Sequence, residues 1–339
     1  MKEVFTYDDL LLVPQYSDIR SREEVSIETD LDDRIHLTIP IIASPMDTVS
    51  EEDTAVSMGY AGGVAVIHRY NSIEEQTGII ASIISAEEDC LVGAAIGVTG
   101  DYLERALALY AAEVDFICLD VAHGHSIMMK EALETLRKKL PEDLHIMAGN
   151  VATVEGFNDL ADWGANSIRC NIGGGSICTT RIQTGHGVPG LQTILDCARS
   201  DRNAKIIADG GLKNSGDIVK ALAAGADAVM LGSLLAGTSE SPGRVFSGPD
   251  GQLRKEYRGM ASAAAQMDWR GKVSSLEGVA HSVPYKGTML DTLGDLSRGI
   301  RSGLSYSGAR SIKELQAKAK WIRQTGASQI ESSAHIKVR

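Results

Sequence analysis

The chain has 339 residues and carries 33 lysines and arginines against 45 aspartates and glutamates, a formal net charge of −12. An acidic field without any Lys- or Arg-rich stretch repels nucleic-acid phosphates, so we expect no nucleic-acid partner. Aromatic residues are scarce at 5% and glycines number 35, a balance that suits many tight turns better than an all-β sandwich.

The cysteines indicate reduced thiols. They are odd in number and contain no CxxC pair, which argues against a disulfide framework or a zinc ribbon; they are Cys90, Cys118, Cys170, Cys178 and Cys197. The first 14 residues place acids where a signal peptide needs an apolar core. No stretch is long enough to span a membrane. We therefore expect a cytoplasmic protein without a membrane partner.

Short apolar runs alternate with amphipathic segments through the first two thirds of the chain. The predicted strands are Pro40–Met46, Gly63–His68, Leu91–Val98, Val114–Val121, His145–Asn150, Ser167–Gly173, Lys205–Gly211 and Ala228–Gly232. Plausible helices follow, among them Asp101–Ala112, Ser126–Lys139, Thr153–Trp163 and Ser215–Ala224. Uniformly apolar strands are typical of a parallel sheet covered by helices. Eight consecutive units favour an α/β fold, a single-domain (β/α)8 TIM barrel, over an open doubly wound sheet.

The rest of the chain flanks this barrel. We expect residues 1–39 to cover the barrel floor and residues 236–290, rich in Gly and Ser, to form a mobile flap or lid after the eighth strand. Ser311–Ile322 is predicted as the last helix, and residues 326–339 as a polar, mobile tail.

Polar residues gather where the predicted strands end, which is where barrel enzymes place their sites. They are Ser44, Met46, Asp47, His68, Arg69, Asp120, His123, His125, Asn150, Arg169, Asn171, Asp209, Gly232 and Ser233. The pair His123 and His125 raises the alternative of a metal site. No matching ligand set recurs on neighbouring strand ends, so we interpret the two as loop residues near a ligand.

The segment from Gly173 to Arg181 is the most informative. Gly173, Gly174 and Gly175 let several backbone N–H groups face one anion, and Ser176 adds a hydroxyl donor. Cys178 follows and becomes a nucleophile wherever its thiolate is stabilised. The competing interpretation is a flexible glycine loop with a structural cysteine.

Two further glycine turns predict a phosphate site at the ends of the seventh and eighth strands. The first is Asp209-Gly210-Gly211 and the second is Leu231-Gly232-Ser233. Asp209 is placed to accept hydrogen bonds from ribose hydroxyls. Its alternative role is a helix cap, but Asn214 and Ser215 lie nearer to the next helix.

With these residues in place, the sequence resembles the IMP dehydrogenase and GMP reductase family over nearly its whole length. The motifs that carry the resemblance are Phe5–Pro14, Ser44–Val49, Ala148–Asn150, the Cys178 loop, Asp209–Gly211, Tyr257–Met260 and Val283–Gly287.

The resemblance implies a site for a purine nucleoside monophosphate, GMP or IMP. Cys178 would attack C2 of the purine, with Thr180 assisting. The implied substrate-binding residues are Ser44, Met46, Arg169, Ser176, Asp209, Gly211, Gly232, Ser233, Tyr257, Met260 and Ala261. The implied cofactor-binding residues are Asp120 and Asn150. Backbone carbonyls of Gly173, Gly175 and Cys178 would bind potassium, and the assembly would be a homotetramer.

Three features favour the reductase activity, in which NADPH converts GMP to IMP and ammonia. Residues 261–282 lack the Arg-Tyr pair that similar dehydrogenases use to activate water, and Glu277 stands where similar reductases carry a catalytic glutamate. The stretch from His68 to Leu91 also leaves no room for the regulatory insertion of most dehydrogenases. NADH or NAD are the other cofactors to consider.

Other features point toward an IMP dehydrogenase lacking the insertion. The sequences of Ser44–Met46 and Asp120–Ser126 are more similar to those of dehydrogenases than to those of typical reductases. Asn171 and Gly174 replace the Gly and Pro usual in the family's cysteine loop. A deoxynucleotide or a modified purine thus stays open as substrate.

Overall fold

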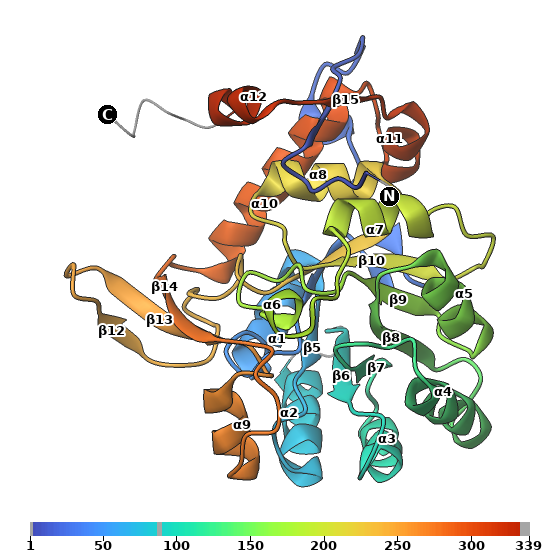
Figure 1. Ribbon diagram of the computed structural model, residues 1–339, viewed down its shortest axis with the longest axis vertical. Coiled ribbons are helices and arrows are strands. Elements are labelled where there is room, and N and C mark those ends of the chain that lie inside the picture. The colour runs from blue at the N-terminus through green and yellow to red at the C-terminus, as the bar shows by residue number, and fades with distance from the viewer. Residues whose placement is uncertain (1–2, 87–89, 333–339) are drawn as a thin grey trace.

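The computed structural model describes residues 3–86 and 90–332. Its centre is a closed parallel barrel in the order β10-β11-β4-β5-β6-β7-β8-β9 (Figure 1). The strands are β4 (Ile41–Ala43), β5 (Val64–Ile67), β6 (Val92–Ile96), β7 (Phe116–Asp120), β8 (His145–Val151), β9 (Ser167–Cys170), β10 (Lys205–Asp209) and β11 (Ala228–Leu231). Pairing of β11 with β4 closes the barrel, which confirms the predicted fold.

Helices surround the barrel in an outer layer. They are α1 (Glu52–Ala61), α2 (Ile73–Ala86), α3 (Tyr102–Ala111), α4 (Ile127–Lys139), α5 (Val154–Asp162), α7 (Gly190–Cys197), α8 (Ser215–Ala223) and α10 (Met289–Tyr306), with the short α6 (Thr180–Thr184) beside the barrel mouth. Asn214 caps α8 by accepting a hydrogen bond from the N–H of Asp217 at 2.9 Å. Asp209 is therefore not needed as that cap.

Most strands end one to three residues earlier than the sequence predicts. Ser44, Met46, Gly211 and Gly232 follow their strands as loop residues. These residues line the cavity at the barrel mouth. The strands stop where the backbone turns away from the ladder to reach that cavity.

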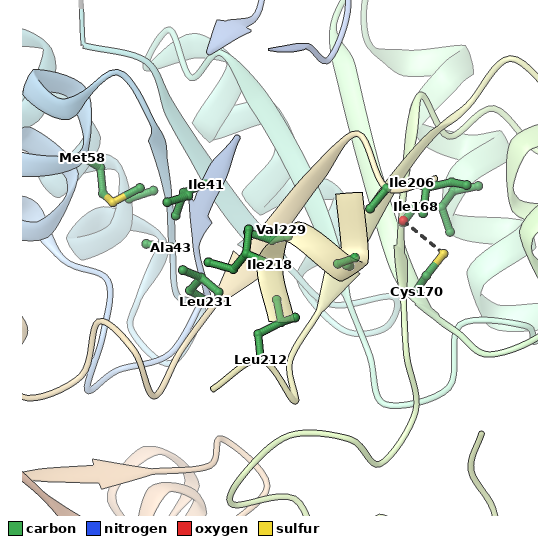
Figure 2. Close-up of a cluster of buried hydrophobic side chains, with 14 of the residues drawn as sticks. Ile41, Ala43, Met58, Ile168, Cys170, Ile206, Leu212, Ile218, Val229 and Leu231 are labelled. Atoms are coloured by element: carbon green, nitrogen blue, oxygen red, sulfur yellow. Dashed lines mark hydrogen bonds between the residues drawn. The ribbon is translucent and has the colours of Figure 1, made fainter. Parts of the chain in front are cut away.

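Two apolar layers hold the barrel. One lies between strands and helices, where Ile41, Val229 and Leu231 pack with Met58 and Ile218 (Figure 2). The other fills the barrel interior. Burying each Leu or Ile side chain contributes about 1.5–3 kcal/mol, so these layers supply most of the folding free energy.

Residues 29–37 lie at the amino end of the barrel. They form a hairpin of β2 (Thr29–Asp30) and β3 (His36–Leu37), after the short 3-10 helix η1 (Arg22–Glu24). Leu31, Ile35 and Leu37 pack into the interior layer. Beside them, Asp32 Oδ2 lies 2.6 Å from Nδ1 of His145, whose Nε2 lies 2.8 Å from Oγ of Ser167.

A segment near the amino end of the chain pairs with one near the carboxyl end. Strand β1 (Leu10–Leu12) pairs antiparallel with β15 (Trp321–Arg323). The prediction of a last helix over Ser311–Ile322 is wrong in its extent, because α11 (Ile312–Lys318) stops at Lys318 and Ile322 pairs with β1. A further helix, α12 (Gly326–Glu331), begins the predicted tail, whose residues 333–339 lie outside the described residues.

Between β11 and α10 the chain forms a separate small sheet, which projects from the barrel in Figure 1. Strands β12 (Val245–Ser247), β13 (Leu253–Arg258) and β14 (Ala280–Pro284) pair antiparallel in this order, and α9 (Ala263–Arg270) joins β13 to β14. We call residues 236–290 the flap. The buried ammonium of Lys255 anchors it by donating to the carbonyls of Thr238, Ser239 and Ser241.

Among the described helices, none combines the length and the apolar character needed to cross a bilayer.

The contact at the barrel floor makes the first prediction. Although partial burial opposes it, hydrogen bonding to His145 and to two backbone N–H groups lowers the pKa of Asp32 from 3.8 to about 2. A carboxylate with a depressed pKa stabilises the fold above its unfolded pKa and loses that contribution as pH falls through its folded pKa. We expect Asp32→Asn to lower the free energy of unfolding by about 1–2 kcal/mol at pH 7, allowing for solvent screening.

Urea denaturation checks this expectation. The difference from the parent protein should shrink as the pH falls from 4 to 2, because Asp32 becomes protonated in the folded protein. The exposed neighbour Asp33 provides the matched control, Asp33→Asn. A difference that grows between pH 4 and pH 2 would contradict the assignment.

Candidate active site

A cavity of about 280 Å³ opens at the carboxyl ends of the barrel strands. The residues to which the sequence analysis assigned a catalytic, substrate-binding, cofactor-binding or potassium-binding role all line it: Ser44, Met46, Asp120, Asn150, Arg169, Gly173, Gly175, Ser176, Cys178, Thr180, Asp209, Gly211, Gly232, Ser233, Tyr257, Met260, Ala261 and Glu277. They come from strand ends, from the loop after β9 and from the flap. The structure thus brings together residues more than 200 positions apart in the chain.

Three side chains form a hydrogen-bonded line at this cavity. Sγ of Cys178 lies 3.1 Å from Oγ1 of Thr180, and that hydroxyl donates to Oε2 of Glu277 at 2.8 Å. Because the hydroxyl's one proton is directed at the carboxylate, its oxygen accepts from the thiol. This arrangement can pass a proton between the sulfur and the carboxylate.

The main chain fixes the spacing of these groups. The N–H of Thr179 donates to the carbonyl of Glu277 at 3.1 Å, and the N–H of Val279 donates to the carbonyl of Ile177 at 3.1 Å. A short antiparallel pairing therefore joins the cysteine loop to the flap, as the bridge between Cys178 and Gly278 also shows. The flap must lie in this position for Glu277 to reach Thr180.

A buried guanidinium organises the strand ends beneath the cavity. Arg169 is 6% exposed and donates to Oδ1 of Asp120 at 2.5 Å and to Oδ2 of Asp209 at 2.9 Å. Nδ2 of Asn150 also donates to Oδ2 of Asp209, at 2.6 Å. Burial opposes ionisation of Asp120, but Arg169 and Arg69 outweigh it and hold the pKa of that carboxyl below its usual value.

Glycines and a tyrosine shape the cavity wall at the ends of β10 and β11. A Cβ on Gly232 would lie 2.8 Å from the hydroxyl of Tyr257, so only glycine permits this approach. Gly211 adopts φ of 78°, which also favours glycine. Burial raises the pKa of Tyr257, which keeps its phenol a neutral donor. Lys286 secures the same wall by donating to the carbonyl of Ser233 at 2.6 Å.

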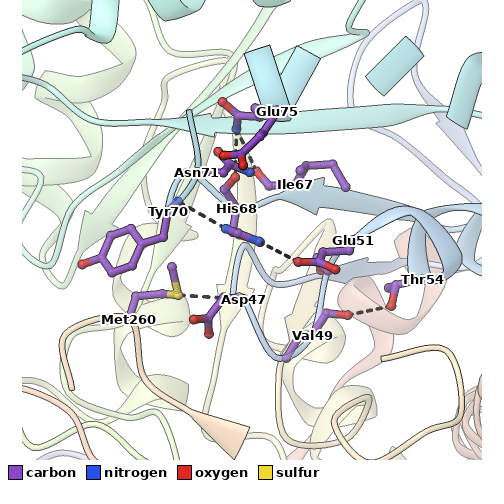
Figure 3. A network of polar contacts seen from close by, with 12 residues as sticks. Asp47, Val49, Glu51, Thr54, Ile67, His68, Tyr70, Asn71, Glu75 and Met260 are labelled. Atoms are coloured by element: carbon purple, nitrogen blue, oxygen red, sulfur yellow. Dashed lines mark hydrogen bonds and ion pairs between the residues drawn. The ribbon is translucent and has the colours of Figure 1, made fainter. Parts of the chain in front are cut away.

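The flap is tied to the loop after β4 through Asp47. The guanidinium of Arg258 donates twice to Oδ2 of Asp47, at 2.7 and 2.9 Å, and once to Asp268 of α9. The N–H of Asp47 also lies 3.3 Å from the sulfur of Met260 (Figure 3). Asp47 therefore positions the flap instead of lining the cavity.

The loop after β5 contributes residues that sequence reasoning missed or left without a role. Arg69 and Tyr70 line the cavity, and Arg69 donates to the carbonyl of Asp120 at 3.2 Å. The Tyr70 ring stacks on Trp269 of α9, with centroids 5.9 Å apart. Arg69 stands at a predicted strand end, which is a usable signal, whereas nothing in the sequence relates Tyr70 to Trp269.

Buried His68 lies behind these residues. Its Nδ1 accepts from the N–H of Tyr70 at 3.2 Å, so the proton is on Nε2, which lies 3.2 Å from Glu51 (Figure 3). It fixes the direction of the loop and does not line the cavity.

The structure places His123 and His125 outside this cavity, so their expected position near a ligand stays a prediction. Neither residue lines it, and Nε2 of His125 lies 2.7 Å from Oδ2 of Asp159. Among the described residues, no cluster of three or more His, Cys, Asp or Glu side chains could hold a metal ion.

The fold and the cavity define a class: a (β/α)8 barrel that combines a cysteine loop with glycine turns suited to a phosphate. Comparison with known proteins agrees. A model of the IMP dehydrogenase / GMP reductase domain matches residues 4–335. The chain therefore belongs to the IMP dehydrogenase and GMP reductase family of oxidoreductases, which use nicotinamide cofactors.

Relatives carry both activity names. The chain is 34% identical to an inosine-5'-monophosphate dehydrogenase of Nitrosopumilus maritimus, covering 98% of each protein. It is also 34% identical to a GMP reductase of Leishmania major, covering 99% of this chain and 97% of that protein. A crystal structure of a Trypanosoma brucei GMP reductase variant with guanosine 5'-monophosphate superposes with a TM-score of 0.93 at 32% identity, covering 99% and 98% of the two chains.

The length of these relatives weakens one of the cues from the sequence. The alignments extend over 470 and 479 positions, more than the 339 residues of this chain. Both relatives therefore contain segments that this chain lacks. A missing insertion does not separate the reductase from the dehydrogenase.

The different exposure of the cysteines predicts that an alkylating reagent reacts selectively with one thiol. Cys178 is partly exposed and the other four cysteines are buried. Burial raises the pKa of Cys118 to about 12 and that of Cys170 well above its usual value. In the native protein, iodoacetamide should therefore label Cys178 at least about 100-fold faster than the others. Peptide mass spectrometry measures the labelling, and Cys178→Ala is the control; equal labelling of a second cysteine would contradict this picture.

Proposed function

We propose that the protein is a GMP reductase, which converts GMP to IMP and ammonia with NADPH through a covalent adduct at purine C2. The line Cys178–Thr180–Glu277 carries this proposal, because it joins a thiol to a carboxylate with one hydroxyl between them. Residues 261–282 contain no Arg-Tyr pair that could activate water. The dehydrogenase reaction needs such a water, whereas the reductase reaction releases ammonia instead.

In this proposal different walls of the cavity bind different parts of the nucleotide. Ser176, Gly211, Gly232, Ser233 and Tyr257 bind the phosphate, with Tyr257 donating its neutral phenol. Asp209 accepts from the ribose hydroxyls through the oxygen that Arg169 and Asn150 leave open. Ser44, Met46, Met260 and Ala261 contact the nucleoside, while Asp120 and Asn150 face the cofactor.

In the proposed reaction these side chains account for each proton that is transferred. The Cys178 sulfur forms a bond to C2 and gives up its proton through Thr180 toward Glu277. The C2–N bond breaks, and the leaving amine takes a proton from the same dyad, since so basic a leaving group needs a general acid. NADPH, when bound, supplies the hydride that C2 receives. The C–S bond then breaks, which releases IMP and restores the thiolate.

In this proposal the cysteine loop also binds a monovalent cation. Carbonyl oxygens are the ligands that hard cations prefer, and the carbonyls of Gly173, Gly175 and Cys178 would hold potassium. The carbonyl of Gly175 already accepts the N–H of Cys178 at 3.1 Å and keeps a second lone pair. Potassium would stiffen this loop. We further propose a cytoplasmic homotetramer.

IMP dehydrogenase is the second candidate. It is supported by the equal 34% identity to relatives of either name. In that reaction the Thr180–Glu277 dyad would take a proton from water instead of giving one to ammonia.

Absorbance of the reduced nicotinamide separates the two activities. With GMP and NADPH we expect loss of absorbance at 340 nm, with one ammonia released per cofactor oxidised. With IMP and NAD we expect no comparable gain. Formation of NADH and XMP in the second mixture would overturn the proposal in favour of the dehydrogenase.

Removing the acid tests the mechanism. Glu277→Gln keeps the hydrogen bond to Thr180 but cannot supply the proton, so kcat for GMP should fall about 10²–10⁴-fold while GMP still binds. Glu256→Gln, at an exposed position of β13, is the matched control. Full activity in Glu277→Gln would remove this residue from the mechanism, and full activity in Cys178→Ala would remove the covalent adduct.

A further inference from the structure

The side chain of Asn171 is wedged between the cysteine loop and the turn after β10. It is 4% exposed, and its Nδ2 donates to the carbonyls of Asp209 at 2.9 Å and of Gly210 at 3.2 Å. Its own N–H donates to the carbonyl of Val151 at 2.9 Å. Asn171 therefore links the ends of β8, β9 and β10.

The same side chain occupies the space beside Gly174. A Cβ on Gly174 would lie 2.6 Å from Oδ1 and 2.8 Å from Cγ of Asn171, and closer still to Nδ2. These are the three nearest atoms, and all belong to Asn171. Gly174 is not among the glycines with positive φ, so its backbone does not require glycine. Asn171 is what excludes a side chain at position 174.

Asn171 and Gly174 are thus one coupled feature. The resemblance to the family gave Gly and Pro as the usual residues at these two positions. Any residue with a Cβ at 174 would collide with the Asn171 amide, and glycine at 171 would free the space. The two departures explain each other sterically.

This feature stands between the two halves of the site. The carbonyl oxygen of Gly174 lies 3.0 Å from where a Cβ on Gly211 would be, so the cysteine loop rests on the turn 209–211. That turn forms the expected phosphate wall, and the loop carries Cys178 four residues after Gly174. The Asn171 amide holds the turn by two hydrogen bonds and is covered by the loop.

We propose that Asn171 is a positioning residue that fixes the Cys178 loop against the phosphate turn, with Gly174 as its obligatory steric partner. The proposal rests on the proposed role of Cys178 as nucleophile. Asn171 acts on the placement of the Cys178 thiol relative to the bound nucleotide, and it takes no part in the chemistry of the substrate.

A double-mutant cycle tests it with Asn171→Gly, Gly174→Ala and the double variant. Glycine suits the φ of 157° at position 171. Gly174→Ala should reduce kcat about tenfold or more in the parent and less than about twofold in the Asn171→Gly background. Asn171→Gly alone should lower kcat about tenfold and change KM for GMP less than about threefold, because the phosphate wall remains.

Gly78→Ala is the matched control, since Gly78 lies in α2 with no atom within 4 Å of the added Cβ. It should leave kcat and KM unchanged. An equal loss from Gly174→Ala in both backgrounds, or no loss in the parent, would overturn the proposal. Should Gly174→Ala fail to fold, recovery of folding in the double variant supports the coupling and failure of both overturns it.

The rate of Cys178 alkylation by iodoacetamide provides a readout that is independent of the reaction. Gly174→Ala should change this rate at least about threefold in the parent and less than about 1.5-fold in the Asn171→Gly background. If the protein turns over IMP instead of GMP, the alkylation cycle can still give the expected result. The proposed function and the positioning role of Asn171 can therefore fail independently of each other. Equal rates in all four proteins would overturn the positioning role.

Discussion

The site depends on one buried charge, the guanidinium of Arg169. It joins β9 to the carboxylates at the ends of β7 and β10, and Asn150 from β8 completes the contact with Asp209. Leaving these two partly buried carboxylates without this partner would cost about 3–5 kcal/mol. The strand ends are therefore held as one rigid unit. The cysteine loop, the glycine turns and the flap are all built upon it.

The barrel could be predicted because its determinants are local. Each strand is a short apolar run, and polar residues or glycines follow it. The exposed strand β12 carries no such pattern, since none of its residues is buried. The pairing of β1 with β15 joins residues more than 300 positions apart, and no local pattern in Ser311–Ile322 distinguishes a strand from the end of a helix. These elements arise from tertiary contacts alone.

Many of the residues that line the cavity could be predicted from the sequence, but the contacts between them could not. Motifs identify Cys178, Thr180 and Glu277, yet the hydrogen bonds between them exist only because the flap returns across the cysteine loop. The role of Asp47 as a flap anchor, and the contact of Tyr70 with Trp269, likewise depend on how α9 docks. Asn171 and Gly174 were visible as departures from the family pattern, but their collision is a three-dimensional fact.

The backbone pairing between the cysteine loop and residues 277–279 has a consequence for idle enzyme. Because main-chain hydrogen bonds hold both partners, displacement of the flap separates the thiol relay from its carboxylate in a single movement. An empty barrel with the flap displaced would have a cysteine but no proton relay. The position of the flap thus decides whether Cys178, Thr180 and Glu277 form one hydrogen-bonded line.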